Sequence, residues 1–510
     1  LASETAAWVK GVTLLEDSPP FPISVANGEI IIDETTRFSF PGSTEERLHL
    51  HALTEIDYNY DFRNDLAAAG SNGFKLYRLN DDRTFSDVTP EMNLGGRWIN
   101  RSYRAVWPFD IEMDGDLDLF LSPVGGSPVV FQNNGDGTFQ ATTPFEAERD
   151  INRFLWGDLT GDGTPEAIVL STSGGLTIFE NLRGGEFDEG TTVSTNIRAI
   201  EVADQNADTQ FEILAVDEQG RVLQFRYSIA NQAYEETELL EAGSAIQNSE
   251  DQRLFAADLD NNGALDLILS SANGTDVWLG DSNRNLQKHA DTLPGKVYSV
   301  FDVEGDERLD LLGIFSDMTP FEMDNNGTKN YSARSIRARA SGTTGDQRIN
   351  SFGIGGEMEV RSGLLYQKQL ITSPIVHFGL GEYEEADMLR IIWPNGSVQA
   401  EFAELGMGDT IFNEQILKGS CPWLFTNDGE DVNFITDILW RSPLGLRINA
   451  QETAGVVQTL DRVKIPGSSL KPVDGIYDLR VTAELWETHF FDYVDLVAVD
   501  HPVDTEIFVD

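Results

Sequence analysis

The chain lacks several sequence features that would directly indicate a fold or a class of partner. It has 510 residues but one cysteine, Cys421, so no internal disulfide can form and stability must come from a packed core or a bound metal. Its 36 Lys and Arg stand against 85 Asp and Glu, a net charge of −49. This balance excludes the basic surface of a nucleic-acid binder and disfavours anionic membrane surfaces. No run reaches the roughly 18 apolar residues of a membrane span, so no membrane insertion is expected.

Common catalytic motifs are missing as well. The sequence has no Gly-x-Ser-x-Gly, His-Glu-x-x-His or Gly-x4-Gly-Lys-Ser/Thr motif and no dinucleotide-binding glycine motif after a strand. His49 and His51 share one face of a predicted strand and could bind a transition metal, but outward polar positions are the commoner explanation for such a pair. His377 is expected to make a structural hydrogen bond. We therefore predict no catalytic residue, no organic cofactor site and no enzymatic activity.

What the sequence does have is an acidic pattern that recurs six times, with oxygen-bearing side chains at positions 1, 3, 5 and 9 of a nine-residue loop. The predicted metal ligands are Asp57, Asn59, Asp61 and Asp65; Asp110, Glu112, Asp114, Asp116 and Asp118; Asp158, Thr160, Asp162 and Glu166; Asp204, Asn206, Asp208 and Glu212; Asp258, Asp260, Asn262 and Asp266; and Asp302, Glu304, Asp306 and Asp310.

The setting of these loops distinguishes them from chance. In so acidic a chain, acids at positions 1, 5 and 9 should occur about twice by composition alone. The loops start 53, 48, 46, 54 and 44 residues apart, and five of them run into apolar β-type segments such as 119–121 and 167–170. Each repeat then continues into a hairpin, most clearly over 129–139, where Gly-Asp-Gly makes the turn. Repeats of this length, made of short strands, predict an all-β fold of four-stranded blades, a β-propeller.

The ligand pattern predicts calcium. Side chains at positions 1, 3 and 5 point to one side of a tight loop, a backbone carbonyl at position 7 completes the turn, and the carboxylate at position 9 closes the cage. Hard oxygen donors in this number suit Ca²⁺ better than Mg²⁺. Position 6 is glycine only at Gly115, Gly163 and Gly263, so these three loops are the favoured sites. In the other three loops the alternative is a turn whose Asp and Asn side chains bind their own backbone.

These motifs carry a family resemblance. The acidic loops and the Asn-Asn-Gly-Asp-Gly-Thr-Phe turn at 133–139 resemble FG-GAP/VCBS repeats, the calcium-loop blades also found in integrin α-chain propellers. Downstream, the segments 354–363, 377–381 and 391–399 are similar to the ASPIC/UnbV domain of cartilage-acidic-protein-like exported proteins. The resemblance implies a propeller of six or seven blades, with seven favoured, followed by C-terminal β-domains. It also implies calcium in the blades, export from the cytoplasm and no established catalytic role.

The predicted domains follow from these matches. Residues 1–45 form an N-terminal segment that closes the propeller or adds a blade, 46–325 the propeller, 326–418 the ASPIC/UnbV-like domain, and 419–510 a β-sandwich-like region. The chain is expected to continue past residue 510. Within the last region, 484–492 brings polar side chains close together, and either a metal or acid/base site or, more commonly, a solvated strand face would explain them.

We expect an extracellular, cell-surface or periplasmic scaffold that binds a protein or glycan partner. One alternative is an accessory or structural subunit of a larger extracytoplasmic assembly. A carbohydrate-active enzyme that uses an Asp pair as acid and base is a less favoured alternative.

Overall fold

The computed structural model describes residues 5–15, 18–145, 148, 150–241, 251–341, 349–401, 410–414, 422–429, 432–438, 460, 462–473, 475–482, 491, 493–502, 505 and 507. The chain divides into two compact units, Leu1–Ala340 with Gln347–Asn413, and Ser341–Asp346 with Glu414–Asp510. Among the described residues, no helix combines the length and hydrophobicity that a membrane-spanning segment requires.

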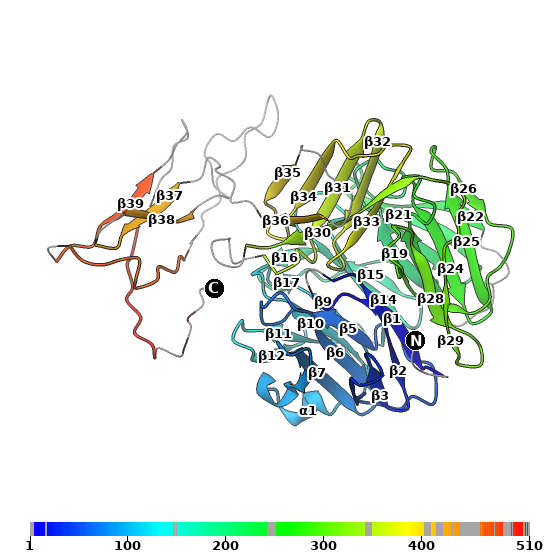
Figure 1. Cartoon of the computed structure of the whole chain (residues 1–510), viewed down its shortest axis with the longest axis horizontal. Helices are drawn as coiled ribbons and strands as arrows, with labels where there is room; N and C mark the ends of the chain where they lie inside the picture. Colours follow the sequence, from blue (N-terminus) through cyan, green and yellow to red (C-terminus); the bar gives the residue numbers. More distant parts are fainter. Residues whose placement is uncertain are drawn as a thin grey trace. The chain divides into compact units, whose positions relative to one another are not determined.

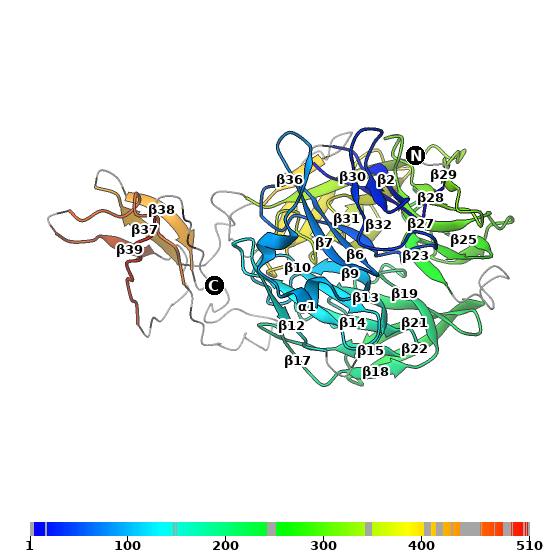
Figure 2. The same cartoon turned by 90° about the horizontal axis from the view of Figure 1, so that it is seen from below.

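The first unit begins with seven successive antiparallel sheets, most of them four-stranded (Figures 1 and 2). They are β1 (Trp8–Val12), β2 (Phe21–Ala26), β3 (Glu29–Ile31) and β4 (Arg37–Ser39); β5 (Leu53–Ile56), β6 (Asp65–Gly70), β7 (Gly73–Leu79) and β8 (Phe85–Asp87); β9 (Tyr103–Phe109), β10 (Asp118–Pro123), β11 (Val129–Asn133) and β12 (Phe139–Thr142); β13 (Ile151–Gly157), β14 (Glu166–Ser171), β15 (Leu176–Phe179) and β18 (Thr191–Ser194); β19 (Ile197–Ala203), β20 (Glu212–Asp217), β21 (Arg221–Ser228) and β22 (Ala233–Glu241); β23 (Arg253–Ala257), β24 (Asp266–Ser271), β25 (Gly274–Gly280) and β26 (Leu286–Lys288); and β27 (Lys296–Phe301), β28 (Asp310–Ile314) and β29 (Pro320–Met323).

Four short elements lie outside these sheets. β16 (Asn181–Arg183) and β17 (Glu186–Phe187) form a separate hairpin, so the fourth strand of that blade is β18. This hairpin turns at Gly184-Gly185. The 3₁₀ helix η1 (Thr89–Met92) and the one-turn helix α1 (Gly96–Ile99) connect β8 to β9.

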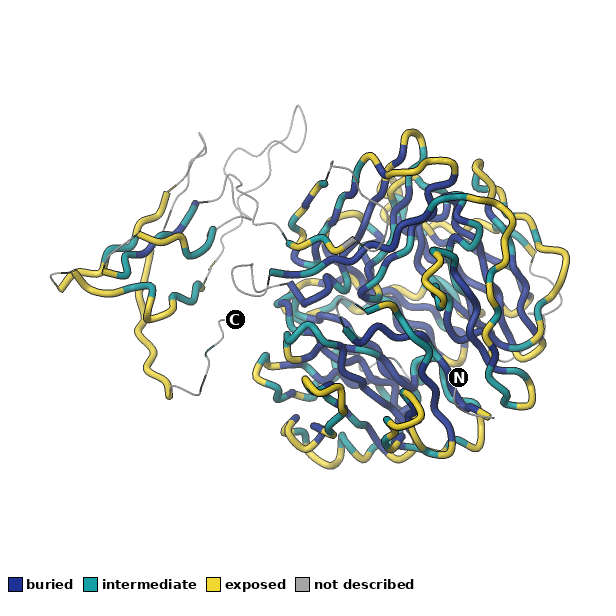
Figure 3. The backbone as a smooth tube through the Cα atoms, viewed as in Figure 1, coloured by how far each residue is buried: buried dark blue, intermediate teal, exposed yellow. Residues whose placement is uncertain are grey.

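The sheets pack as the blades of a β-propeller. The second strand of each is buried along its whole length in β6, β10, β14, β20, β24 and β28, because each sheet is covered by its neighbours on both faces (Figure 3). First strands contact one another in chain order from β5 to β27, and β1 contacts β27 and β28. One core joins the first, second and last sheets and includes Trp8, Leu53 and Leu312. The ring of blades therefore closes between its first and last sheets.

The hairpin turns lie where the sequence predicts them in several blades. β3 pairs with β4, β7 with β8 and β11 with β12, each across a Gly-, Asp- or Asn-containing turn. Each acidic loop connects the first strand of a blade to the second, and its position 9 is the first residue of the second strand. Because all six loops share this connection, they lie at the same end of the propeller. The first sheet, β1 to β4, has no acidic loop.

The rest of the first unit is a two-sheet β-domain over a core that includes Phe378, Leu389 and Trp393. One sheet has the order β33-β30-β36 and the other β32-β31-β34-β35. Their bounds are β30 (Ser332–Arg339), β31 (Glu357–Ser362), β32 (Leu365–Leu370), β33 (Val376–Gly381), β34 (Met388–Ile392), β35 (Val398–Glu401) and β36 (Thr410–Asn413). β36 runs parallel to β30, and the other neighbouring pairs are antiparallel.

The second unit has one described sheet, with the order β38-β37-β39. Its strands are β37 (Trp423–Asn427), β38 (Val432–Asp437) and β39 (Leu479–Thr482). The Asn-Asp-Gly segment 427–429 begins at the last residue of β37, which pairs with β38. Most of the polar segment 484–492 lies outside the described residues, as does Cys421.

Candidate metal-binding loops

All six acidic loops have the same backbone conformation. Positions 4 and 6 are left-handed in every loop, with φ between 57° and 99°. Position 4 is Tyr60, Met113, Gly161, Ala207, Asn261 or Gly305, and position 6 is Phe62, Gly115, Gly163, Thr209, Gly263 or Glu307. Glycine at position 6 was expected to favour the turn, but Phe62, Thr209 and Glu307 adopt the same left-handed conformation there. A β-branched residue such as Thr209 at φ 80° is strained, and such strain is typical of functional loops.

The position-1 aspartate organises each loop by the same pair of hydrogen bonds. Its two carboxylate oxygens accept the backbone N–H groups of positions 5 and 6. In the loop at 204–212, Asp204 accepts from Asp208 and Thr209, both at 3.0 Å. Asp57, Asp110, Asp158, Asp258 and Asp302 make the equivalent pairs. The side chain at position 5 also accepts the N–H of position 7 in all six loops.

Three of the loops bring ligand atoms together. Oxygens from Asp158, Asp162 and Glu166 lie within 4.8 Å of one another, as do those from Asp204, Asp208 and Glu212, and those from Asp258, Asp260 and Asp266. In the first of these groups the hydroxyl of Thr160 also donates to Glu166, at 3.2 Å. These three groups could hold a metal ion. One of them is the loop at 204–212, which has Thr209 at position 6 and was therefore not among the three favoured sites.

In the other three loops, the carboxylate oxygens of the described residues do not form such a group. In the loop at 57–65, position 7 is Arg63, whose guanidinium lies 2.8 Å from Asp61 and also pairs with Asp81. An ion pair of this kind does not by itself separate the loops, because Arg226 lies 2.7 Å from Asp208 and Lys329 lies 2.9 Å from Asp260 in two of the convergent groups. In the loop at 110–118, Gln132 hydrogen bonds to Glu112 and orients it toward β11. We find no comparable contact that explains the loop at 302–310.

Burial makes these carboxylates hard to ionise without a cation. Desolvation raises the pKa of Asp57 and Asp204 to about 6, and that of Glu166 and Glu212 to about 8. Neighbouring acids add to the effect, since Asp204 and Asp208 both raise the pKa of Glu212. A bound divalent cation would remove this penalty. The donors at positions 1, 3, 5 and 9 are oxygens only, without histidine or cysteine, which fits Ca²⁺ or Mg²⁺ and not zinc or copper.

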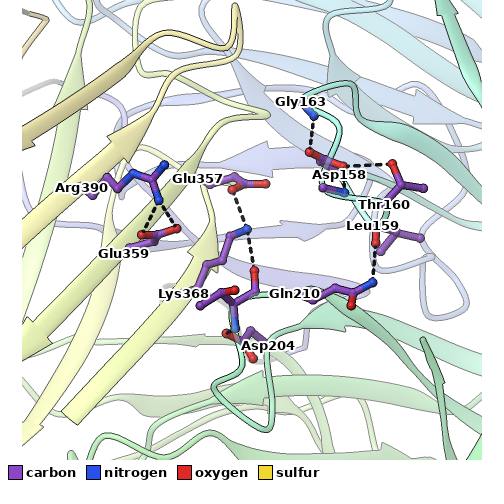
Figure 4. A network of polar contacts seen from close by, with 12 residues as sticks. Asp158, Leu159, Thr160, Gly163, Asp204, Gln210, Glu357, Glu359, Lys368 and Arg390 are labelled. Atoms are coloured by element: carbon purple, nitrogen blue, oxygen red, sulfur yellow. Dashed lines mark hydrogen bonds and ion pairs between the residues drawn. The ribbon is translucent and has the colours of Figure 1, made fainter. Parts of the chain in front are cut away.

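The β-domain at residues 332–413 contacts several of these loops. Figure 4 shows Lys368 of β32 between Glu357 and the loop at 204–212. Its ammonium group lies 2.8 Å from Glu357, donates to the carbonyl of Thr209 at 3.1 Å, and lies 4.4 Å from the ring centre of Phe211. Lys368 also stabilises the charged form of Asp158 in the neighbouring loop. A residue of the β-domain therefore contacts one candidate metal loop and acts electrostatically on a second.

The loop at 258–266 packs directly against β33. His377 hydrogen bonds to the side chain of Asn261 at 2.8 Å, the structural role that the sequence predicts for it, and Gly381 donates its N–H to the carbonyl of Asn261 at 2.8 Å. At Gly379 a Cβ atom would lie 2.0 Å from the carboxylate of Asp258. At Gly263 a Cβ atom would lie 2.3 Å from Leu365. These two glycines permit the close approach of loop and β-domain.

A further contact ties the β-domain to the loop at 57–65. Ser351 donates its hydroxyl to Asp57 at 2.5 Å, and both residues are buried. The acidic end of the propeller is therefore an internal interface at several blades. The family resemblance implies that an ASPIC/UnbV domain packs against the propeller, but it does not say at which end. Neither Lys368 nor Ser351 belongs to a recurring motif, so the contacts with the acidic loops could not be predicted.

The interpretation of His49 and His51 as outward polar residues is wrong. They precede β5, their rings lie 6.0 Å apart, and both contact Trp107 inside the propeller. His49 hydrogen bonds to the carbonyl of Asn152 at 2.9 Å, and His51 hydrogen bonds to Arg153. The alternation of polar and apolar residues suggested a solvated strand face, but the face in question is turned toward the propeller axis.

Comparison with known families agrees with this architecture. The FG-GAP-like repeat model matches residues 57–121 and 110–169, and the ASPIC and UnbV model matches residues 346–410. The chain carries FG-GAP-like repeats and an ASPIC/UnbV domain. The repeats correspond to the second to fourth blades, and the ASPIC/UnbV match covers most of the β-domain that contacts the acidic loops.

Solved structures give more distant similarities. A lectin from Agrocybe aegerita that recognises non-reducing terminal N-acetylglucosamine is 18% identical, over 55% of this chain and 79% of its own, with a TM-score of 0.40. The BP39L lectin from Burkholderia pseudomallei is 10% identical, over 62% and 95%, with a TM-score of 0.45. Saccharomyces cerevisiae Sqt1 is 12% identical, over 62% and 84%, with a TM-score of 0.40. These values support no functional inference. The comparison with curated proteins found no match.

Proposed function

We propose that the protein is an exported, calcium-stabilised β-propeller scaffold that binds a protein or glycan partner. The observation that carries the proposal is the convergence of buried oxygen ligands in the loops at 158–166, 204–212 and 258–266. Calcium at these positions would stiffen one end of the propeller and its interface with the ASPIC/UnbV domain. Free calcium is far more abundant outside the cytoplasm, and we therefore place the protein there.

The acidic loops themselves are not the proposed partner surface. At the blades described above they are covered by the ASPIC/UnbV domain, through Lys368, Gly379 and Ser351. The opposite end of the propeller and the outer strands are left for a partner. The excess of acid over base favours a partner with basic patches and gives binding a strong salt dependence. No catalytic role is proposed.

The metal part is tested by thermal unfolding of the whole chain with Ca²⁺, with Mg²⁺ and after removal of metal. Calcium should raise the unfolding midpoint strongly, and magnesium should replace it poorly. Asp204→Asn should reduce the calcium effect. Asp136→Asn is the matched control, because Asp136 also accepts a backbone N–H in its own turn but lies outside the acidic loops. Equal midpoints with and without calcium would overturn the metal part.

The scaffold part is tested by binding of calcium-loaded and metal-free protein to a glycan array, alongside light scattering of the purified chain. Binding that is retained by the calcium-loaded form and lost after metal removal supports the proposal. A defined oligomer without glycan binding would instead favour the accessory-subunit alternative.

A further inference from the structure

The outer strand of the fifth blade differs from the other described outer strands. β22 has nine residues, whereas β4, β8, β12, β18, β26 and β29 have three or four each. The strand order β19-β20-β21-β22 places it at the edge of its sheet, and Figure 2 shows it at the rim of the propeller. At roughly 3.3 Å per residue, this edge is about 30 Å long.

The outward edge of β22 has unused backbone groups. In an antiparallel ladder, successive residues direct their N–H and C=O groups to opposite sides, so about half of those in β22 face away from β21. Among the described residues, no backbone hydrogen bond joins β22 to an element other than β21. A long free edge of this kind is a template on which another chain can pair.

Glutamates make this edge acidic. Four of the nine residues of β22 are exposed glutamates, at positions 235, 236, 238 and 241. The six other outer strands together contain two acids, Asp87 in β8 and Glu322 in β29. The acidity of the chain as a whole therefore does not account for the charge of β22.

The neighbouring strand β21 neutralises little of this charge. One of its two arginines lies 2.7 Å from Asp217 and 3.4 Å from Glu238, and the other lies 2.7 Å from Asp208. In the described part of the chain, the three other glutamates of β22 have no Lys or Arg within ion-pair distance. The edge thus combines free backbone groups with a negative charge that the blade itself leaves largely unpaired.

We propose that β22 binds an extended, Lys- and Arg-rich segment of a partner protein, which adds to the blade as a fifth strand. The free N–H and C=O groups of the edge supply affinity through backbone hydrogen bonds, and the glutamates select basic side chains. Glu235 and Glu236 are adjacent and therefore lie on opposite faces of the sheet, so basic side chains are accommodated on both faces of the added strand. The inference rests on the scaffold role proposed above and specifies the partner as a protein.

A purely protective role does not explain this edge. Charged side chains on a free edge prevent aggregation, and short outer strands have the same effect in the other blades. Protection therefore accounts for the glutamates but not for an edge of nine residues. A second copy of this chain is not the partner either, because pairing of β22 with itself would place glutamates opposite glutamates.

The test is titration calorimetry of the calcium-loaded full chain with three synthetic nine-residue peptides at about 150 mM salt. The first repeats Lys-Lys-Thr three times, the second is the same peptide with every backbone N–H methylated, and the third repeats Glu-Glu-Thr. The first should bind with one site per chain, and the other two at least about tenfold more weakly. No binding of the first peptide, or equal binding of the methylated one, would overturn the proposal.

Two variants of equal net charge locate the site. Replacing the glutamates at 235, 236 and 241 by lysine should weaken binding of the basic peptide at least about tenfold. The control replaces Glu34, Glu91 and Glu189 by lysine, because these glutamates are also exposed but lie outside β22. Equal weakening in the two variants would show attraction to the acidic chain as a whole and would overturn the proposal, as would normal binding by the β22 variant.

A measurement on the unsubstituted chain keeps the test independent of how the variants fold. The basic peptide should slow amide hydrogen exchange within residues 233–241, because strand addition protects the outward N–H groups. Unchanged exchange there would contradict the proposal even if the peptide binds elsewhere. Calcium binding and glycan binding are measured separately, so a failure of the peptide test overturns this inference and leaves the proposed function to be decided by its own experiments.

Discussion

The loops at 57–65 and 204–212 share one backbone, and each has an arginine paired with its position-5 aspartate, but they differ in whether their carboxylate oxygens converge. Both have left-handed residues at positions 4 and 6, and both have a position-1 aspartate that accepts the same two N–H groups. At 57–65 the position-7 residue is Arg63, which pairs with Asp61. At 204–212 it is Gln210, which donates to two backbone carbonyls, and three ligand oxygens converge.

The difference teaches that the acidic motif determines the turn but does not by itself make a metal site. Hydrogen bonds from the position-1 aspartate hold the loop whether or not glycine is present. The side chains that contact the remaining oxygens lie at positions that the repeat does not specify, such as Arg63, Gln132 and Arg226.

Removing metal should have the largest effect. Each occupied site stabilises the native state by RT ln(1 + [L]/Kd), about 2.7 kcal/mol when calcium is at 100 times Kd. Removing calcium from three sites should therefore lower the denaturant concentration at the unfolding midpoint substantially. The measurement is urea unfolding with and without calcium. Loss of no more than one site's contribution would mean that most of the convergent loops are metal-free turns.

The pH dependence of the metal-free protein should be the next largest effect. Glu166 and Glu212 have pKa values raised from 4.5 to about 8 in the folded state, so the folded chain binds more protons than the unfolded chain between these values. Stability of the metal-free protein should therefore fall as pH rises from about 4.5 to about 8. Calcium should abolish this fall, because it binds the ionised form. The check is urea unfolding across this pH range, and identical slopes with and without calcium would contradict it.

Gly379→Ala should undock the ASPIC/UnbV domain from the loop at 258–266. The new Cβ would collide with Asp258 and the backbone of Asn261, and overpacking of this kind costs about 1–3 kcal/mol. Calcium affinity should fall along with stability, because the collision displaces a ligand. Gly95→Ala is the control, since a Cβ there meets nothing within 4 Å. Unchanged calcium binding in the Gly379 variant would show that the two regions are independent.

Exchange of the position-7 residues should have the smallest effect on stability and the clearest effect on metal count. Gln210→Arg should remove one bound calcium by placing a second guanidinium beside Asp208, which already pairs with Arg226, and Arg63→Gln should add one by freeing Asp61. The count is made by elemental analysis of dialysed protein. Counts that stay the same in both variants would show that position 7 does not decide occupancy.

The repeat period, the strand–loop–strand order and most hairpin turns could be predicted from sequence because they depend on local residues. The convergence of only some loops could not, because it depends on contacts from other strands and, at Lys368, from a domain more than 150 residues away. The histidine pair was misread for a similar reason. Alternation shows that His49 and His51 share a face, but only the closed ring shows that this face points inward.

The central claim is that calcium occupies the loops at 158–166, 204–212 and 258–266. The most direct measurement is anomalous diffraction from a crystal grown with calcium. The account predicts one peak among Asp158, Asp162 and Glu166, one among Asp204, Asp208 and Glu212, and one among Asp258, Asp260 and Asp266. Peaks in none of these loops, or only in the loops at 57–65, 110–118 and 302–310, would contradict it.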